Sequence, residues 1–244
     1  MTQHQSTICK GCWQKIHFPV PLRGVLSLPF RMLGIRPSRM NPNTCTICEL
    51  MFTKVMKART ISIDATILFA DVRGYTSLSQ SHSAEAMSGL LDAFYDECAH
   101  AIWECDGLLN KAIGDAVMGV FNFPIGRDDH TKQAVLAARA IQSRWCAKRE
   151  KLVEALGLTG GEVGVGIGIH CGQLSFGEFG RAHRDLTAIG SVVNIASRAQ
   201  SAAAAGEILI SQGVYDRVQS ELASSKAQEY KMKGIQEPVL LYTA

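Results

Sequence analysis

Two aspartates of the chain stand where carboxylates could hold metal ions. Asp71 follows a short, mostly apolar run, Ala65–Ala70, that predicts a buried strand. Asp115 belongs to a Gly-Asp pair that predicts a tight turn between two strands. Carboxylates on adjacent strand ends can hold a pair of Mg²⁺ ions for in-line displacement at phosphorus. Either aspartate alone is more typical of a strand end or turn.

Two further groups of residues fit phosphate chemistry. The residues Val-Arg-Gly-Tyr-Thr after Asp71 predict a turn whose backbone N–H groups can face a phosphate. Asn194 and Arg198 are four residues apart in a predicted helix, so both lie on one face and can converge on one ligand.

Four of the eight cysteines form two Cys-x-x-Cys pairs, Cys9/Cys12 and Cys45/Cys48. In a chain without an export signal, such pairs favour a metal site over disulfides. Four thiolates suit one tetrahedral zinc ion, and an iron–sulfur centre is the second interpretation. The 32 residues between the pairs exceed usual zinc-ribbon spacing, so four reduced thiols are the alternative. The four scattered cysteines are expected to be buried apolar thiols.

The elements that must position these residues alternate between strands and amphipathic helices from Thr60 onward. Helices are predicted at Ser83–Cys105, Asp128–Leu156 and Ser191–Ala203. Besides Ala65–Ala70, strands are predicted within Gly107–Phe123, as a hairpin, and at Val163–Ile169, Glu207–Ile210, Glu229–Lys233 and Val239–Tyr242. The order β-α-β-β-α-β, with further β/α elements, predicts an α+β fold in which helices pack on a largely antiparallel sheet.

Composition and charge divide the chain into two predicted units. Of 244 residues, 47% are apolar and 19% charged, which excludes a disordered chain. Residues 1–60 hold nine Lys or Arg against one acid, Glu49, whereas the remainder is acidic. We therefore expect a basic, Cys-rich segment at residues 1–59, for regulation or docking, and a second domain at residues 60–244.

The basic segment could meet an anionic membrane surface or an acidic regulatory protein, or could dock on the acidic domain. Nucleic acid is disfavoured because few aromatic residues lie among the basic ones. No apolar run reaches membrane-spanning length and no secretory signal is apparent, so the expected location is cytoplasmic, with peripheral membrane contact as an option.

Three motifs together carry a resemblance to a known family. Residues 68–76 (LFADVRGYT), 110–115 (NKAIGD) and 187–198 (TAIGSVVNIASR) resemble the class III nucleotidyl cyclases in order and spacing. The resemblance covers about residues 62–244. It implies a ferredoxin-like βαββαβ cyclase domain with additional C-terminal α/β elements.

The resemblance also implies a role for each matched position. Asp71 and Asp115, 44 residues apart, and the backbone of Val72 match metal-binding positions for two Mg²⁺ or Mn²⁺ ions. The turn through Gly74, Tyr75 and Thr76 matches the phosphate-binding turn.

Base-reading and catalytic positions are implied in the same way. Lys111 and Thr187 match the pair that reads the base, and Lys233 matches a triphosphate-binding lysine. Asn194 matches the residue that orients the ribose, and Arg198 the one that neutralises the transferring phosphoryl group.

The function implied is an adenylate cyclase, a lyase that converts ATP to 3′,5′-cyclic AMP and pyrophosphate at a homodimer interface. Lys111 favours ATP because an ammonium donates to N1 of adenine but would confront the N1–H of guanine. The alternatives are a cyclase for another nucleotide, making cyclic GMP or a cyclic pyrimidine signal, and a catalytically silent nucleotide-sensing scaffold. A zinc-ribbon nucleic-acid binder carrying a cyclase body is disfavoured.

Overall fold

A computed structural model describes residues 6–58, 60–158, 163–180, 185–222, 225–230 and 238–244. Within them, eight strands form one mixed sheet in the order β2-β3-β1-β4-β6-β8-β7, and β5 pairs with the far end of β4. The strands are β1 Ile61–Arg73, β2 Leu108–Ile113, β3 Ala116–Phe121, β4 Gly164–Phe179, β5 Asp185–Ile189, β6 Ile208–Ser211, β7 Ala227–Tyr230 and β8 Val239–Thr243. Only β4 and β6 pair in parallel among these strands.

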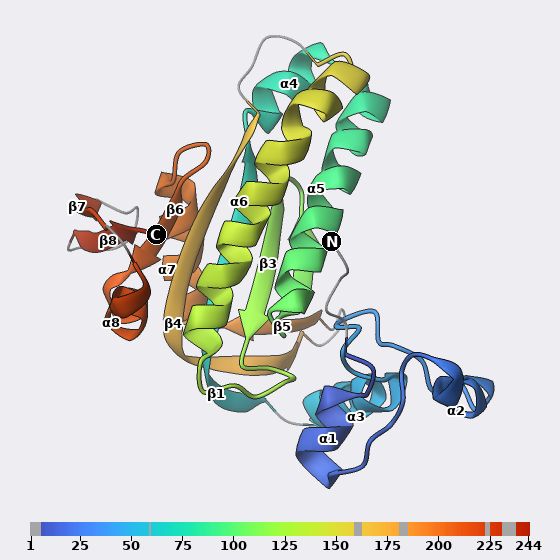
Figure 1. Ribbon diagram of the computed structural model, residues 1–244. Helices are drawn as coiled ribbons and strands as arrows, with labels where there is room; N and C mark the ends of the chain where they lie inside the picture. Colours follow the sequence, from blue (N-terminus) through green and yellow to red (C-terminus); the bar gives the residue numbers. More distant parts are fainter. Residues whose placement is uncertain (1–5, 59, 159–162, 181–184, 223–224, 231–237) are drawn as a thin grey trace.

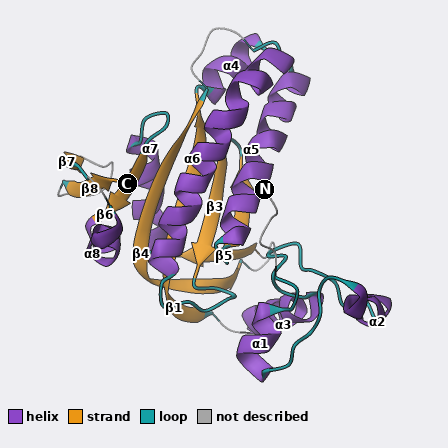
Figure 2. Cartoon of the chain, viewed as in Figure 1, coloured by secondary structure: helices purple, strands orange, loops and turns teal. Residues whose placement is uncertain are grey.

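Helices cover both faces of the sheet. The long helices α5 (Ala84–Glu104) and α6 (His130–Ala155) lie side by side on one face, and α7 (Ser191–Ala202) packs on the other (Figures 1 and 2). The short helix α4 (Tyr75–Ser81) follows β1, and α8 (Gln212–Val218) with a 3-10 turn η2 (Gln219–Glu221) follows β6.

The alternation of side chains along β1 creates the two cores. Leu68, Ala70 and Val72 join the core under α5 and α6, whereas Ile67 and Phe69 join the core under α7. Asp71 continues the second set, because alternate residues of a strand share a face. The aspartate is thus placed at the end of β1 on the side of α7.

A glycine allows α7 to approach β4 closely. A Cβ atom at Gly168 would lie 2.0 Å from the backbone nitrogen of Gln200 and 2.4 Å from the carbonyl oxygen of Ala196. No other residue fits there without moving the helix. The face of α7 that includes Ala196 therefore lies against the sheet.

The N-terminal module, residues 6–58, has its own small core. It consists of α1 (Lys10–Ile16), a 3-10 turn η1 (Val25–Ser27), α2 (Leu28–Met32) and α3 (Thr46–Ala58). The four paired cysteines pack there with Val20 and Leu22. In Figure 1 the module lies beside one end of the sheet, and α2 projects away from it.

Most predicted elements are confirmed, with four corrections. The strand predicted at Ala65–Ala70 extends over β1, and the one at Val163–Ile169 extends over β4, because each prediction covers the continuously buried run, which lies in the middle of β1 and at the start of β4. The helices α4 and α8 were not predicted, since each is only seven residues long. Cys98 and Cys171 are buried as expected, whereas Cys146 is exposed on α6. Of the strand predicted at Glu229–Lys233, residues 231–233 lie outside the described residues.

Candidate active site

The end of β1 and the β2–β3 hairpin hold Asp71 and Asp115 together. Asp71 lies opposite Ala116 in the β1–β3 register, and the Val72 N–H donates to the Asp115 carbonyl oxygen at 3.0 Å. At the hairpin turn, Gly114 adopts φ +60°. The hydroxyl of Tyr95 on α5 donates to the Gly114 carbonyl oxygen and so connects the turn to this helix.

Both carboxylates line one open cavity of about 330 Å³. Burial and the neighbouring charge of Asp115 raise the pKa of Asp71 from 3.8 to about 6, against the opposing effect of Arg73. The guanidinium of Arg73 lies 3.2 Å from the Asp71 carboxylate. Two acceptor oxygen groups that repel each other fit a hard divalent cation, which would bind both and remove the repulsion.

The rest of this cavity is lined by residues 72–77. Gly74 has φ +81° and stands at the N-cap position of α4, so the turn through Tyr75 and Thr76 lies beside the carboxylates. The side chain of Val72 is buried in the core, which leaves only its backbone for a ligand. The predicted metal and phosphate positions are therefore brought together.

Lys111 and Thr187 form a separate cluster with two residues that the sequence analysis did not assign. Lys111 forms an ion pair with Asp185 at the start of β5. Asn110 donates from its side-chain amide to the Leu186 carbonyl oxygen at 3.0 Å, and Thr187 Oγ1 donates to Asn110 Oδ1 at 3.4 Å. Asp185 and Thr187 are two apart on a strand and so share a face, which is the sequence signal that could have identified Asp185.

Asn194 and Arg198 lie on the face of α7 directed away from their own sheet. Each is two positions from Ala196, or about 200° around the helix axis, and Ala196 packs on β4. Asn194 is exposed and Arg198 half-buried. Neither side chain has a hydrogen bond or ion pair with any residue that the structure describes. The side chains of Asn194 and Arg198 are thus available for a ligand. They point away from the sheet face on which their own helix packs.

Arg73 connects the carboxylates to α7, a role that the sequence analysis did not assign. Its guanidinium passes over β4, where a Cβ atom at Gly166 would lie 2.4 Å from Arg73 Nε, and it donates to the Gln200 carbonyl oxygen. Lys233, the predicted triphosphate-binding lysine, lies outside the described residues.

The four paired cysteines converge in the N-terminal module. All four are buried, and their sulfur atoms lie within 4.8 Å of one another. Burial raises the pKa of Cys12 to about 12, whereas hydrogen bonds with neighbouring thiols, chiefly Cys48, lower that of Cys45.

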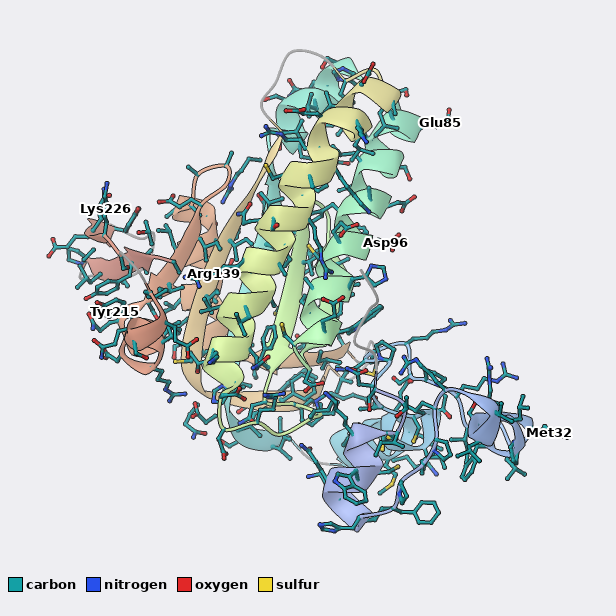
Figure 3. All side chains as sticks on the ribbon, in the orientation of Figure 1. Met32, Glu85, Asp96, Arg139, Tyr215 and Lys226 are labelled. Atoms are coloured by element: carbon teal, nitrogen blue, oxygen red, sulfur yellow. The ribbon has the colours of Figure 1, made fainter. Side chains whose placement is uncertain are left out.

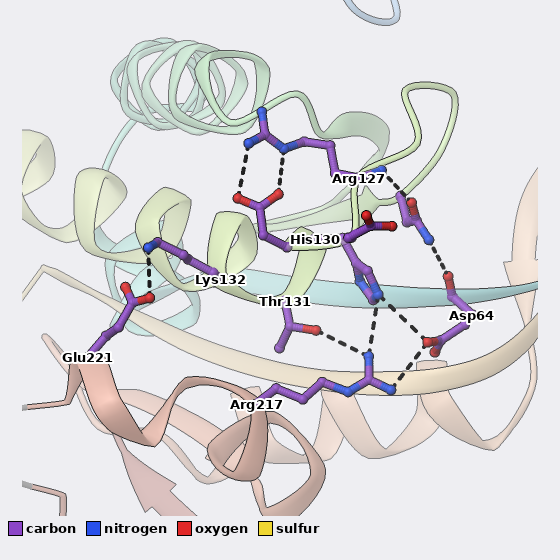
Figure 4. A pocket seen from close by; sticks show the side chains of 10 residues that line it. Asp64, Arg127, His130, Thr131, Lys132, Arg217 and Glu221 are labelled. Carbon is purple, nitrogen blue, oxygen red and sulfur yellow. Dashed lines mark hydrogen bonds and ion pairs between the residues drawn. The ribbon is translucent and has the colours of Figure 1, made fainter. Parts of the chain in front are cut away.

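A second, larger cavity of about 790 Å³ lies between the start of α6, α8 and β1 (Figure 4). Three ion pairs occupy it: Arg127–Asp129 at 2.7 Å, Lys132–Glu221 at 2.7 Å and Arg217–Asp64 at 3.2 Å. Asp128 also lines this cavity, so four acids face three bases, and the lining has no net positive charge to attract a phosphate.

Comparison with known proteins decides the family. A model of the adenylate and guanylate cyclase catalytic domain matches residues 58–243. The chain belongs to this family. Among curated proteins, the adenylate cyclase of Anabaena cylindrica is 33% identical over 184 residues, which are 72% of this chain and 36% of that protein. Adenylate cyclase 1 of Rhizobium meliloti (strain 1021) is 30% identical over 136 residues, 55% of this chain and 20% of that protein.

The cyclase fold is equally clear from solved structures. The adenylyl cyclase CyaB from P. aeruginosa is similar with a TM-score of 0.69 and 31% identity, over 76% of this chain and 95% of that one. The guanylyl cyclase Cya2 shares the fold with a TM-score of 0.69 and 24% identity, over 75% and 92%. The chain spans little more than a third of the Anabaena cylindrica relative's length and a fifth of the Rhizobium meliloti relative's. In the described residues, no helix is both long and apolar enough for a membrane span.

Proposed function

We propose that this chain is an adenylate cyclase that converts ATP to 3′,5′-cyclic AMP and pyrophosphate in a homodimer. The observation that carries the proposal is the shared cavity of Asp71 and Asp115 beside the turn at residues 72–76. Such a cavity can hold divalent cations and a triphosphate together. Two Mg²⁺ or Mn²⁺ ions, when bound there, would activate the ribose 3′-hydroxyl and neutralise the phosphate oxygens.

The chain's own residues position the nucleotide. The carboxylates of Asp71 and Asp115 would hold the metal ions, and backbone N–H groups near Gly74 donate to phosphate oxygens. Arg198 neutralises charge that develops as the 3′ oxygen bonds to the α-phosphorus and the bond to pyrophosphate breaks. Asn194, four residues earlier on the same helix face, orients the ribose.

The orientation of α7 supports a site shared between two copies of the chain. Within one chain, Asn194 and Arg198 project from the outer face of α7, whereas Asp71 is on the sheet face beneath it. A second copy related by a two-fold axis can bring its Asn194 and Arg198 to the first copy's carboxylates, and the reverse. Two equivalent sites result.

The cluster around Lys111 supports adenine as the base. The Lys111 ammonium and the Thr187 hydroxyl stand together, held by Asn110 and Asp185. An ammonium can donate to N1 of adenine but not accept from N1–H of guanine, so the donor selects ATP over GTP.

An exposed apolar tip supports contact with an anionic membrane surface. Five large apolar side chains in and beside α2 are between 56% and 90% exposed: Val25, Leu26, Leu28, Met32 and Leu33. Met32 lies at the outer end of the molecule in Figure 3. Arg31, Arg36 and Arg39 are exposed nearby. Apolar side chains flanked by cations fit an interface rich in anionic lipid, and we propose peripheral attachment there.

The catalytic proposal is tested by incubating the purified protein with each of the four nucleoside triphosphates and Mn²⁺. Cyclic AMP from ATP, resolved by chromatography, is the expected main product. Cyclic GMP or a cyclic pyrimidine nucleotide as the main product would replace the adenine assignment. Absence of any cyclic product, with intact nucleotide binding, would leave the nucleotide-sensing scaffold as the better account.

A further inference from the structure

The geometry of the four cysteines (Cys9, Cys12, Cys45 and Cys48, here the four-cysteine site) matches a single bound ion. An ion about 2.3 Å from each of four tetrahedral sulfurs places those sulfurs about 3.8 Å apart. Three of the sulfur–sulfur distances here are 3.4 to 3.6 Å, and all lie within 4.8 Å. A cluster of several irons needs room between its thiolates for inorganic atoms, and sulfurs this close leave none.

The surrounding backbone is suited to thiolates. The N–H groups of Cys12 and Cys45 donate to Cys9 Sγ at 3.3 and 3.2 Å. A Cβ atom at Gly11 would lie 3.0 Å from Cys48 Sγ, so glycine lets the first loop approach the second pair closely. Cys48 stands in the first turn of α3, where the helix dipole favours a negative sulfur.

The same short loops attach the module to the cyclase body. Lys10, between the first two cysteines, reaches both carboxylate oxygens of Asp106 at 2.6 and 2.7 Å. Asn43, two residues before Cys45, donates to the Trp103 carbonyl oxygen at 3.0 Å and to Asp106 at 3.2 Å. The backbone N–H of Lys10 also donates to the Asn43 carbonyl oxygen at 2.9 Å, which ties the two loops together.

Asp106 is the centre of this attachment. It is only 3% exposed, has φ +59°, and forms the turn between α5 and β2. Arg127, from the loop before α6, lies 2.9 Å from its second oxygen. Two further bonds join module and body at the same turn: Asn41 donates to the Gly107 carbonyl oxygen, and Trp103 Nε1 donates to the Met40 carbonyl oxygen, both at 2.8 Å. Loss of Lys10 would leave this buried carboxylate with Arg127 as its cation partner and would remove the ion pair that joins the module to the turn.

Both elements that leave this turn lead to the candidate active site. β2 begins at Leu108, carries Lys111 and ends at the hairpin turn with Asp115. α5 holds the same hairpin turn through the bond from Tyr95 to the Gly114 carbonyl oxygen. Among the described residues, no hydrogen bond or ion pair joins the module to the residues that line the carboxylate cavity, so the module acts through the turn.

We propose that the four-cysteine site binds one Zn²⁺ ion, and that this ion fixes the N-terminal module on the α5–β2 turn and thereby positions the β2–β3 hairpin for catalysis. Zinc binding releases the thiol protons to solvent and orders two loops that the sequence separates by 32 residues. The first half of the proposal is zinc binding and the attachment to the turn, and it does not depend on cyclase activity. The second half rests on the proposed cyclase function.

Metal content and hydrogen exchange test the two halves on the full-length protein. Reduced, chelator-treated protein is titrated with Zn²⁺, and metal is measured before and after. We expect about one zinc per chain at this site and slower amide exchange in residues 103–113 when zinc is bound. The double variant Cys9→Ser/Cys12→Ser should lose the zinc and the slowed exchange. The first half would be overturned if this variant kept one zinc, or if the wild-type site bound iron instead of zinc. It would also be overturned if amide exchange in residues 103–113 were the same with and without zinc.

Two matched variants separate metal binding from attachment. Lys10→Met leaves the thiols intact, so it should keep zinc, exchange faster in residues 103–113, and lower kcat by about tenfold through a misplaced hairpin. Lys10→Arg keeps a cation opposite Asp106 and should restore slow exchange and kcat. Cys146→Ser removes an exposed thiol elsewhere and should match wild type throughout. Fast exchange with unchanged kcat in Lys10→Met would overturn the second half. The zinc and hydrogen-exchange measurements do not require an active enzyme. A protein without cyclase activity would therefore refute the proposed function, and these two measurements would still test the first half.

Discussion

Lys111 and Asp185 form an ion pair between two strands that are not neighbours in the sheet. β2, β3, β1 and β4 pair in succession, and β5 returns from the far end of β4 to place Asp185 against β2. The charge of Asp185 therefore holds the ammonium that we assign to reading the base.

Because of this ion pair, a change of base preference from adenine to guanine should also require a substitution at Asp185. Lys111→Glu with Thr187→Cys should lower ATP turnover by about tenfold or more, because a donor becomes an acceptor. The new glutamate would also face the Asp185 carboxylate. Adding Asp185→Asn should therefore permit GTP turnover that the double variant shows weakly or not at all. Turnover is measured with ATP and GTP in parallel, and unchanged ATP turnover in the double variant would show that Lys111 does not read the base.

Removing either carboxylate should abolish catalysis without unfolding the protein. Asp71→Ala and Asp115→Ala should each lower kcat by about 100-fold or more, since each removes a ligand of the metal pair. Both side chains line an open cavity, so each variant should keep the wild-type circular dichroism and should unfold at a midpoint no lower than that of wild type. More than a few per cent of residual activity in both variants would contradict the two-metal site.

The raised pKa of Asp71 predicts a pH-dependent stability in the metal-free protein. Burial and the Asp115 charge raise this pKa to about 6 from 3.8, so the folded state binds the proton more tightly than the unfolded state. The stabilisation is fully present below about pH 4 and is lost as the pH rises through about 6. Asp71→Asn has no carboxyl group that ionises at this position, so the variant should not lose stability in this pH range.

Thermal unfolding in chelator measures the effect. The midpoint difference between Asp71→Asn and wild type should be several degrees more positive at pH 8 than at pH 4.5. Added Mg²⁺ should raise the wild-type midpoint at pH 8 and leave that of the variant nearly unchanged. A midpoint difference that does not vary with pH would contradict the assigned pKa.

The apolar tip around α2 should bind lipid vesicles in a charge-dependent way. Wild type should sediment with vesicles containing phosphatidylserine and much less with neutral ones, and the binding should weaken with salt. Leu26→Ser/Met32→Ser should reduce binding to the anionic vesicles. Leu136→Ser, which alters a partly exposed apolar residue on α6, is the matched control. Equal binding of all three proteins would show that the tip is not the lipid contact, and no binding by wild type would favour a protein partner over lipid.

The sequence predicted the sheet and its long helices because their periodicity is strong. α5 begins at Ala84, one residue after its predicted start at Ser83, and the hairpin turn falls at Gly114–Asp115 as expected. The motifs also located the residues at the carboxylate cavity. α7 begins at Ser191, as predicted.

Contacts between segments far apart in the chain could not be predicted from the sequence. Lys10 and Asp106 are 96 residues apart, and nothing in the pattern of either segment marks the other as its partner. The contacts of Asp185 and Arg73 could not be predicted for the same reason, because the identity of a charged residue does not indicate which strand or helix it will face. Short helices such as α4 leave too few turns for a periodic signal.

Subunit complementation tests the central claim, a cyclase site shared between two copies, most directly. Asp71→Ala and Arg198→Ala chains should each be inactive alone, and mixing them should form a heterodimer in which one site carries both changes and the other neither. With free exchange of subunits, about half the dimers are mixed and half of their sites intact, so cyclic AMP production should recover to about a quarter of wild type. No recovery, with exchange verified by differently tagged chains, would contradict the shared site even if both single variants were inactive.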